Sequence, residues 1–142
     1  MQDSAPTPLF KKLNLGAHTE IAVFDAPDSF ESELELLKGV KIARNPGKPK
    51  AIKFGLAFAI TQTQLDRLSK ILAAAAVGDA VLWFAYPKGT SRRYRCEFNR
   101  DTGWSVLRAA GFDTVRSVAI DEDWTGLRFR RRQYVKSAAS DC

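Results

Sequence analysis

The stretch AVLWFAY, residues 80–86, is apolar at every position, so both of its alternating sets of side chains are suited to burial. AIKFGLAFAI, residues 51–60, is also apolar on both alternating sets apart from one lysine. A strand of this kind is covered on both faces, which is typical of the central strands of a parallel sheet. The two stretches therefore predict a sheet with helices on each side.

The flanking segments alternate between strand and helix patterns, which favours an α/β fold. Asp28 with Glu31, and Thr61 with Gln64, have the spacing of helix capping pairs, and Gly78 is expected just after the end of a helix. The expected strands span residues 20–26, 40–44, 51–60, 80–86, 112–121 and 125–135, and the expected helices span 8–16, 28–38, 61–77 and 101–110.

The 142 residues, 45% of them hydrophobic, suffice for one compact domain. We expect a reduced, cytoplasmic protein with no membrane association. It has no apolar stretch of about 18 residues, no signal-peptide pattern in MQDSAPTP and only two cysteines. The net charge of +6 permits attraction to polyanions. Residues 72–142 carry ten arginines and two lysines, against two arginines and eight lysines in residues 1–71.

Four stretches together resemble an uncharacterised bacterial family of short proteins, a domain of unknown function. They are LNLG (13–16), VLWFAYPK (81–88), AAGF (109–112) and AIDEDWTGLRF (119–129). A sheet that ends in a hairpin with an antiparallel last strand also resembles the Rossmann-like fold of S-adenosylmethionine-dependent methyltransferases. The resemblance implies a shortened, three-layer, mostly parallel sheet of order 2-1-3-4-6-5. It implies no established activity or catalytic residue.

This resemblance implies one Rossmann-like domain over residues 8–135, with flexible termini at 1–7 and 136–142. It also directs attention to the turn after the first strand. Methyltransferases have a glycine-rich turn there, because the backbone must approach the cofactor closely. Here the turn is FDAPDS, residues 24–29, without a glycine. We therefore predict no cofactor, although an altered S-adenosylmethionine site stays open.

Polar residues follow several of the predicted strands, at the carboxyl edge where open parallel sheets bind ligands. Asp25 follows the first strand and Lys88 the fourth, and Asp121, Asp123 and Trp124 lie between the last two. Lys88, Asp121 and Asp123 are candidate catalytic residues, because a lysine beside carboxylates can serve in acid–base chemistry. The alternative is an ordinary ion pair between Lys88 and a carboxylate, which would hold this loop against the final hairpin.

The apolar strand at 80–86 leads into a cationic loop, SRRYRC, residues 91–96. Basic residues around an aromatic ring suit contact with phosphate together with stacking. A second cluster, Arg128, Arg130 and Arg132, should share one face of the last strand and form an exposed, dimer or polyanion surface. The predicted ligand-binding residues are Asp25, Lys88, Ser91, Arg92, Arg93, Arg95, Asp121 and Trp124.

Other chemistry has little support in the sequence. His18 is the only histidine, so a zinc site or a serine–histidine triad is not expected, and no metal site is predicted. Cys96 is either a thiol activated by the neighbouring arginines or a small, half-buried residue.

Three functions stay open at this point. The first is a non-catalytic Rossmann-like module that binds an anionic small molecule or a protein partner at the carboxyl edge of the sheet. The second is an enzyme that uses Lys88 and the nearby carboxylates on a small substrate, with or without an atypical S-adenosylmethionine site. The third is a nucleic-acid-binding protein. The chain is expected to be a monomer or a homodimer.

Overall fold

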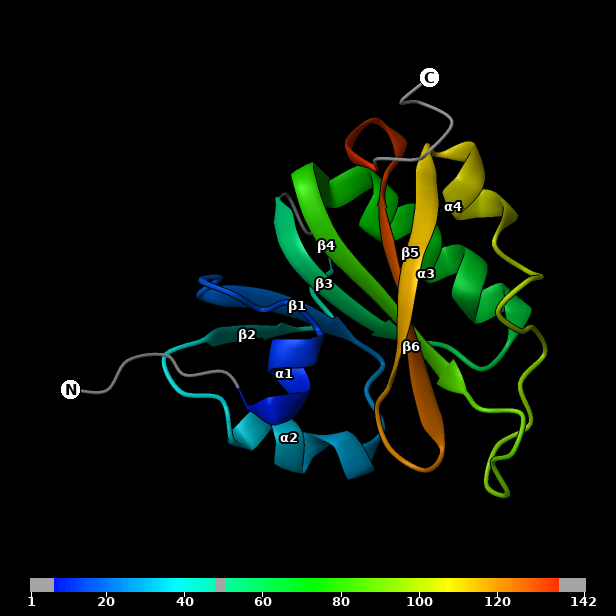
Figure 1. Ribbon diagram of the computed structural model, residues 1–142, viewed down its shortest axis with the longest axis horizontal. Coiled ribbons are helices and arrows are strands. Elements are labelled where there is room, and N and C mark those ends of the chain that lie inside the picture. Colours follow the sequence, from blue (N-terminus) through cyan, green and yellow to red (C-terminus); the bar gives the residue numbers. More distant parts are fainter. Residues whose placement is uncertain (1–6, 48–50, 136–142) are drawn as a thin grey trace.

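The computed structural model describes residues 7–47 and 51–135 (Figure 1). Its centre is a six-stranded sheet of order β2-β1-β3-β4-β6-β5, which confirms the predicted order. The strands are β1 (Glu20–Phe24), β2 (Lys41–Arg44), β3 (Ile52–Phe58), β4 (Ala76–Pro87), β5 (Phe112–Ala119) and β6 (Trp124–Arg131). β1 to β4 pair in parallel, and β6 runs antiparallel to both β4 and β5.

Helices lie on both faces of the sheet and give the predicted three layers (Figure 1). α1 (Pro8–Lys12) and α2 (Glu31–Glu35) cover one face, and α3 (Gln62–Ala75) and α4 (Ser105–Ala109) cover the other. β4 contributes to both cores, with Trp83 on the α1 side and Phe84 on the α3 side. No helix of the described residues is long and apolar enough to cross a membrane.

Several elements differ from their predicted bounds. The segment expected as a helix over 28–38 forms a 3₁₀ turn, η1 (Asp28–Phe30), followed by the short α2, and neither has a side-chain cap. Glu31 pairs with Arg44 of β2 instead. Similarly, α4 is only the last half of the helix expected over 101–110. Both helices are short because each is held by the burial of a single side chain, Leu34 in α2 and Leu107 in α4.

The junction of α3 with β4 also differs. Thr61 caps α3 as predicted, since its Oγ accepts a hydrogen bond from the backbone N–H of Gln64 at 3.1 Å. The helix ends at Ala75, however, and β4 begins at once, so Gly78 lies inside the strand with φ +56° rather than at the helix end. Between Ile52 and Phe54 the register with β4 shifts, and Gly78 allows the turn of the backbone that this irregularity requires.

The ends of the chain bear on two further predictions. β6 ends at Arg131 and continues as a 3₁₀ turn, η2 (Arg132–Tyr134), so Arg132 and Val135 do not extend the strand as expected. Thr7, expected in a flexible terminus, is the N-cap of α1 and accepts a hydrogen bond from Phe10 N–H at 3.2 Å. The rest of the predicted flexible termini, 1–6 and 136–142, lies outside the described residues.

Gly55 of β3 leaves room for the Leu72 side chain of α3, because a Cβ there would lie 2.5 Å from Leu72 Cδ2 and 3.1 Å from Ile52 Cγ2. We therefore expect Gly55→Ala to lower the free energy of unfolding by about 1–3 kcal/mol, because the fully buried Leu72 side chain must shift in a packed core. Urea denaturation measures this change. Gly89→Ala is the matched control, because a Cβ at Gly89 meets nothing within 4 Å. Equal loss in both variants would contradict the close approach.

Candidate functional site

The candidate site lies at the carboxyl edge of the sheet, where β4 ends and β6 begins. Pro87, the last residue of β4, is opposite Trp124, the first residue of β6, in the antiparallel register. The cationic loop after β4 and the acidic turn before β6 therefore start from adjacent positions. This brings together Lys88 and Asp123, which are 35 residues apart in the sequence.

Asp123 holds the cationic loop against the β5–β6 turn. Its carboxylate accepts a hydrogen bond from Ser91 Oγ at 2.9 Å and lies 3.6 Å from Arg93 Nε. Its backbone carbonyl accepts a hydrogen bond from Lys88 N–H at 2.8 Å. The ion pair that we expected between Lys88 and a carboxylate is thus formed by Arg93 with Asp123. Lys88 contacts Asp123 through its backbone N–H. Within the described residues the Lys88 ammonium has no carboxylate within ion-pair distance.

Asp121 shapes the turn itself. Its Oδ1 accepts hydrogen bonds from the backbone N–H groups of Asp123 and Trp124, each at 2.8 Å. The Trp124 ring is buried between two aromatic rings, with ring-centroid distances of 5.2 Å to Phe58 and 5.0 Å to Tyr94. Asp121 and Asp123 therefore both have structural contacts at this corner.

The loop after β4 encloses a hollow of about 490 Å³. Lys88 and Arg95 line it with positive charge, and Tyr86, Tyr94 and Phe98 line it with aromatic surface. Burial raises the pKa of the Tyr86 phenol, so its hydroxyl stays neutral well above pH 7. Sequence analysis did not identify Tyr86 or Phe98 as site residues, because aromatic residues beside apolar runs are indistinguishable from core residues.

Glu97 connects the far side of this hollow to the start of α3 by two hydrogen bonds. Its carboxylate accepts a hydrogen bond from Gln62 N–H at 2.9 Å, and its own N–H donates to the carbonyl of Ile60 at 3.0 Å. Together with Asp123 on the other side, these contacts hold the loop at two points, so hydrogen bonds within the protein fix the shape of the hollow. A preformed site loses less conformational entropy when it binds.

Most of the arginines outside this loop form ion pairs or hydrogen bonds with other groups of the protein. Arg130 Nη2 lies 2.6 Å from the Asp79 carboxylate, and Arg116 Nη2 donates to Asn14 Oδ1 at 2.7 Å. The predicted face of Arg128 and Arg130 exists, but Arg132 pairs with Asp113 beyond the strand. In the part of the chain that the structure describes, ion pairs form between Arg44 and Glu31, Arg67 and Asp25, Arg93 and Asp123, Arg108 and Asp113, Arg130 and Asp79, and Arg132 and Asp113.

By contrast, the segment after β4, residues 88–100, keeps unpaired charge in and beside the cationic loop. Lys88, Arg92, Arg95 and Arg100 form no ion pair with any described carboxylate. Lys88 and Arg95 line the hollow, whereas Arg92 is exposed on the loop and does not line it. This segment therefore keeps free positive charge at the carboxyl edge, as its sequence indicated.

Asp25 lies at the same edge but in a separate network, between the ends of β1 and β3. Its Oδ2 accepts hydrogen bonds from Gln64 Nε2 at 2.9 Å and Arg67 Nη2 at 2.8 Å. Gln64 Oε1 accepts a further hydrogen bond from Ile60 N–H at 2.7 Å. Asp25 N–H donates to Asn45 Oδ1 at 2.7 Å. The side chain of Gln64 thus bridges the ends of the two strands.

Comparison with known proteins supports the fold. No family model matches the sequence, and a search of the curated proteins finds no match. Among solved structures, a SAM-dependent methyltransferase from Aquifex aeolicus has a TM-score of 0.59 at 13% identity, covering 90% of each chain. The N-methyltransferase NodS from Bradyrhizobium japonicum has a TM-score of 0.54 at 13% identity, covering 87% of this chain and 92% of its own. A possible exported protein from Bordetella parapertussis has a TM-score of 0.59 at 10% identity, covering 87% of this chain and 65% of its own.

At these identities the likeness shows the fold alone, a methyltransferase-like Rossmann fold, as the sequence predicted. The residues at the end of β1 do not fit S-adenosylmethionine bound as that fold would place it. Ligands of such sheets bind where the strand order reverses, between β1 and β3. There Asp25, Gln64 and Arg67 satisfy one another across the crevice, and the turn after β1 has no glycine to let a cofactor approach.

The role of Asp123 in holding the loop can be tested by truncation. We expect Asp123→Ala to lower the free energy of unfolding by about 1–2 kcal/mol, because Ser91 and Arg93 lose their acceptor. Hydrogen exchange of the amides at 88–95 should become faster, which mass spectrometry measures. Glu122→Ala is the control, since Glu122 is exposed and has no hydrogen bond within the described residues. Unchanged exchange at 88–95 would contradict the role of Asp123.

Cys96 borders the same hollow and is half-buried, and burial raises the pKa of its thiol despite the arginines nearby. Because the thiolate is the reactive form, the rate of alkylation should rise with pH through a midpoint above that of an ordinary thiol. We expect this profile with iodoacetamide in a Cys142→Ser background. The same variant unfolded in urea should recover the ordinary midpoint. A midpoint at or below the ordinary one in the folded protein would favour the activated thiol instead.

Proposed function

We propose that this protein is a non-catalytic Rossmann-like module that binds an anionic ligand in the hollow formed by the loop after β4. The observation that carries the proposal is the pair Lys88 and Arg95, two cations without a described ion-pair partner, which line a hollow of about 490 Å³. Pockets of about 300–1,000 Å³ commonly take small molecules.

The lining favours an acidic group attached to an apolar or aromatic body. Charge-assisted hydrogen bonds from lysine and arginine to carboxylate or phosphate are stronger than neutral ones. Tyr86, Tyr94 and Phe98 offer apolar wall on which the rest of the ligand can pack. An acidic side chain of a protein partner has the same chemistry and is the other candidate that the proposal covers.

The contacts of the acidic residues support binding rather than catalysis. Asp121 and Asp123 accept hydrogen bonds from the turn and the loop, and Glu97 accepts one from Gln62 N–H. A carboxylate that holds the backbone in place is poorly suited to exchange protons with a substrate. An enzyme that uses Lys88 with these carboxylates, and an altered S-adenosylmethionine site, are the alternatives.

Two further expectations from the sequence stay predictions. They are a location in the cytoplasm and membership of the short bacterial family that the sequence resembles.

Binding of anions tests the proposal directly. We expect pyrophosphate or an aromatic carboxylate such as 2-naphthoate to raise the melting temperature of the protein in a thermal-shift assay. Lys88→Glu and Arg95→Glu should each remove the shift, because both replace an attracting charge by a repelling one. Lys70→Glu, on the exposed surface of α3, makes the same change in net charge away from the hollow and should keep it.

Further arms separate the alternatives. A shift with S-adenosylmethionine or its demethylated product, S-adenosylhomocysteine, would favour the enzyme. Binding of a short oligonucleotide with an affinity that falls steeply with salt would favour the nucleic-acid function. The proposal is wrong if no anion in the panel shifts the wild-type protein, or if Lys88→Glu and Arg95→Glu bind the anions as the wild type does.

A further inference from the structure

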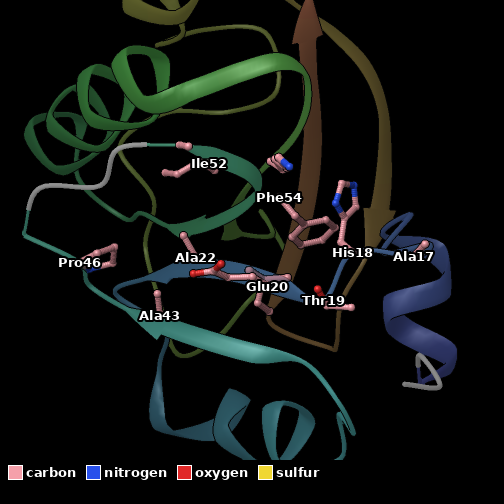
Figure 2. A pocket seen from close by; sticks show the side chains of 12 residues that line it. Ala17, His18, Thr19, Glu20, Ala22, Ala43, Pro46, Ile52 and Phe54 are labelled. Carbon is pink, nitrogen blue, oxygen red and sulfur yellow. The ribbon is translucent and has the colours of Figure 1, made fainter. Parts of the chain in front are cut away.

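At the edge opposite the cationic loop, β1 and β3 separate and leave a wedge in the sheet. They pair only from Ala22 to Phe24, opposite Gly55 to Ala57. Before that point β1 continues to pair with β2, and β3 pairs with β4. A hollow of about 550 Å³ lies in this wedge, and Figure 2 looks into it. It is slightly larger than the hollow at the carboxyl edge.

Two alanines with small side chains form the floor of the wedge. Ala22 of β1 and Ala43 of β2 are direct partners in the parallel register and point from the same face of the sheet into the hollow (Figure 2). Pro46 and Ile52 border the floor. α3 packs over β3 and β4, and none of the described residues between β2 and β3 forms a helix that would cover β1 and β2.

Polar groups gather at the other end of the wedge. The Glu20 side chain extends over the floor toward Ala22, and His18 stands beside Phe54, with 6.0 Å between their ring centroids (Figure 2). Lys53 also lines the hollow. Within the described residues, neither the Glu20 carboxylate nor the Lys53 ammonium has an ion-pair partner.

The backbone of Glu20 adds hydrogen-bonding groups to this end. The carbonyl of Thr19 accepts a hydrogen bond from Lys41 N–H of β2 at 2.7 Å, and the carbonyl of Val23 accepts one at 2.8 Å from Asn45 N–H, directly after β2. In a parallel pair, successive residues direct their N–H and C=O groups to opposite sides of the strand. The N–H and C=O of Glu20 therefore face the wedge, where β3 has already turned away.

Lys53 and His18 also border a smaller hollow of about 280 Å³, together with Val77 and Asp79. Asp79 is an acid that could have neutralised Lys53, but its carboxylate is held by Arg130, with Nη2 2.6 Å away. Hydrogen bonding to Arg130 is the main cause that lowers the pKa of Asp79, which keeps this pair charged at neutral pH. The Lys53 ammonium thus remains available to a ligand.

We infer that the wedge is a second binding site, for a planar heteroaromatic small molecule that carries both N–H donors and an acidic group. The ring lies on the floor of Ala22 and Ala43, its N–H groups donate to Glu20, and its acidic group contacts Lys53. A hollow of this volume is within the usual range for such ligands. Nucleoside monophosphates and aromatic amino acids share this chemistry.

Titration of the ¹⁵N-labelled protein with AMP and, separately, with L-tryptophan tests the inference by NMR. At least one of them should shift the amide signals of residues 18–22 and 52–54 in a saturable way. Lys53→Glu should raise the dissociation constant at least roughly tenfold, because a charge-assisted contact becomes a repulsion. Ala43→Leu should abolish binding, because the larger side chain fills the floor.

Matched variants keep the test independent of folding and of the cationic loop. Lys70→Glu and Ala109→Leu make the same changes on exposed helix surfaces and should bind as the wild type does. Lys88→Glu should also leave these shifts unchanged, because Lys88 lies at the opposite edge. Shifts with AMP alone or with L-tryptophan alone identify the ligand class and support the site. Absence of shifts at 18–22 and 52–54 with both ligands, or wild-type affinity in Lys53→Glu and Ala43→Leu, overturns it.

Discussion

Burial of β4 on both faces is the constraint on which the rest of the structure depends. Leu82, Trp83, Phe84 and Ala85 are all completely inaccessible to solvent. Trp83 Nε1 donates a hydrogen bond to the carbonyl of Leu13 at 2.7 Å, which satisfies the one polar atom of a buried ring and anchors the segment after α1. β4 is also the strand at which the direction of the sheet changes, since it pairs in parallel with β3 and antiparallel with β6.

This central strand also determines where the candidate site forms. β4 ends beside the start of β6, so the loop that follows it meets the β5–β6 turn directly. Asp123 and Glu97 then hold the loop from two sides by hydrogen bonds. The hollow between these contacts is thus a consequence of strand pairing. Its positive charge comes from Lys88 and Arg95, which form no ion pair with the carboxylates of the β5–β6 turn. At the same carboxyl edge, the side chain of Gln64 bridges the ends of β1 and β3 by hydrogen bonds.

The contacts of the arginines show that a basic composition does not by itself produce a basic surface. A chain with ten arginines in its second half suggests a basic surface. In the structure Arg130, Arg132 and Arg108 lie beside carboxylates from other elements, which uses much of that charge internally. Arg131 likewise donates to the carbonyls of Gly78 and Ala76 and lies over the Phe112 ring. The segment around Arg95, in contrast, keeps four cations without an acidic partner among the described residues, namely Lys88, Arg92, Arg95 and Arg100.

The sequence by itself determined the class of the sheet, because continuous apolar runs at 51–60 and 80–86 must be covered on both faces. The expected strand order came from the resemblance of the chain to the methyltransferase-like fold, and the structure confirms it. It also indicated the loop after β4, since a proline and several cations directly follow a buried strand. It overestimated the lengths of α2 and α4, because propensity and capping spacing do not report how much of a helix the core can bury. Only the tertiary structure decided which arginines are paired, that Gln64 bridges β1 and β3, and that the strands diverge near Glu20. Those features arise from contacts between residues far apart in the chain, which no local pattern records.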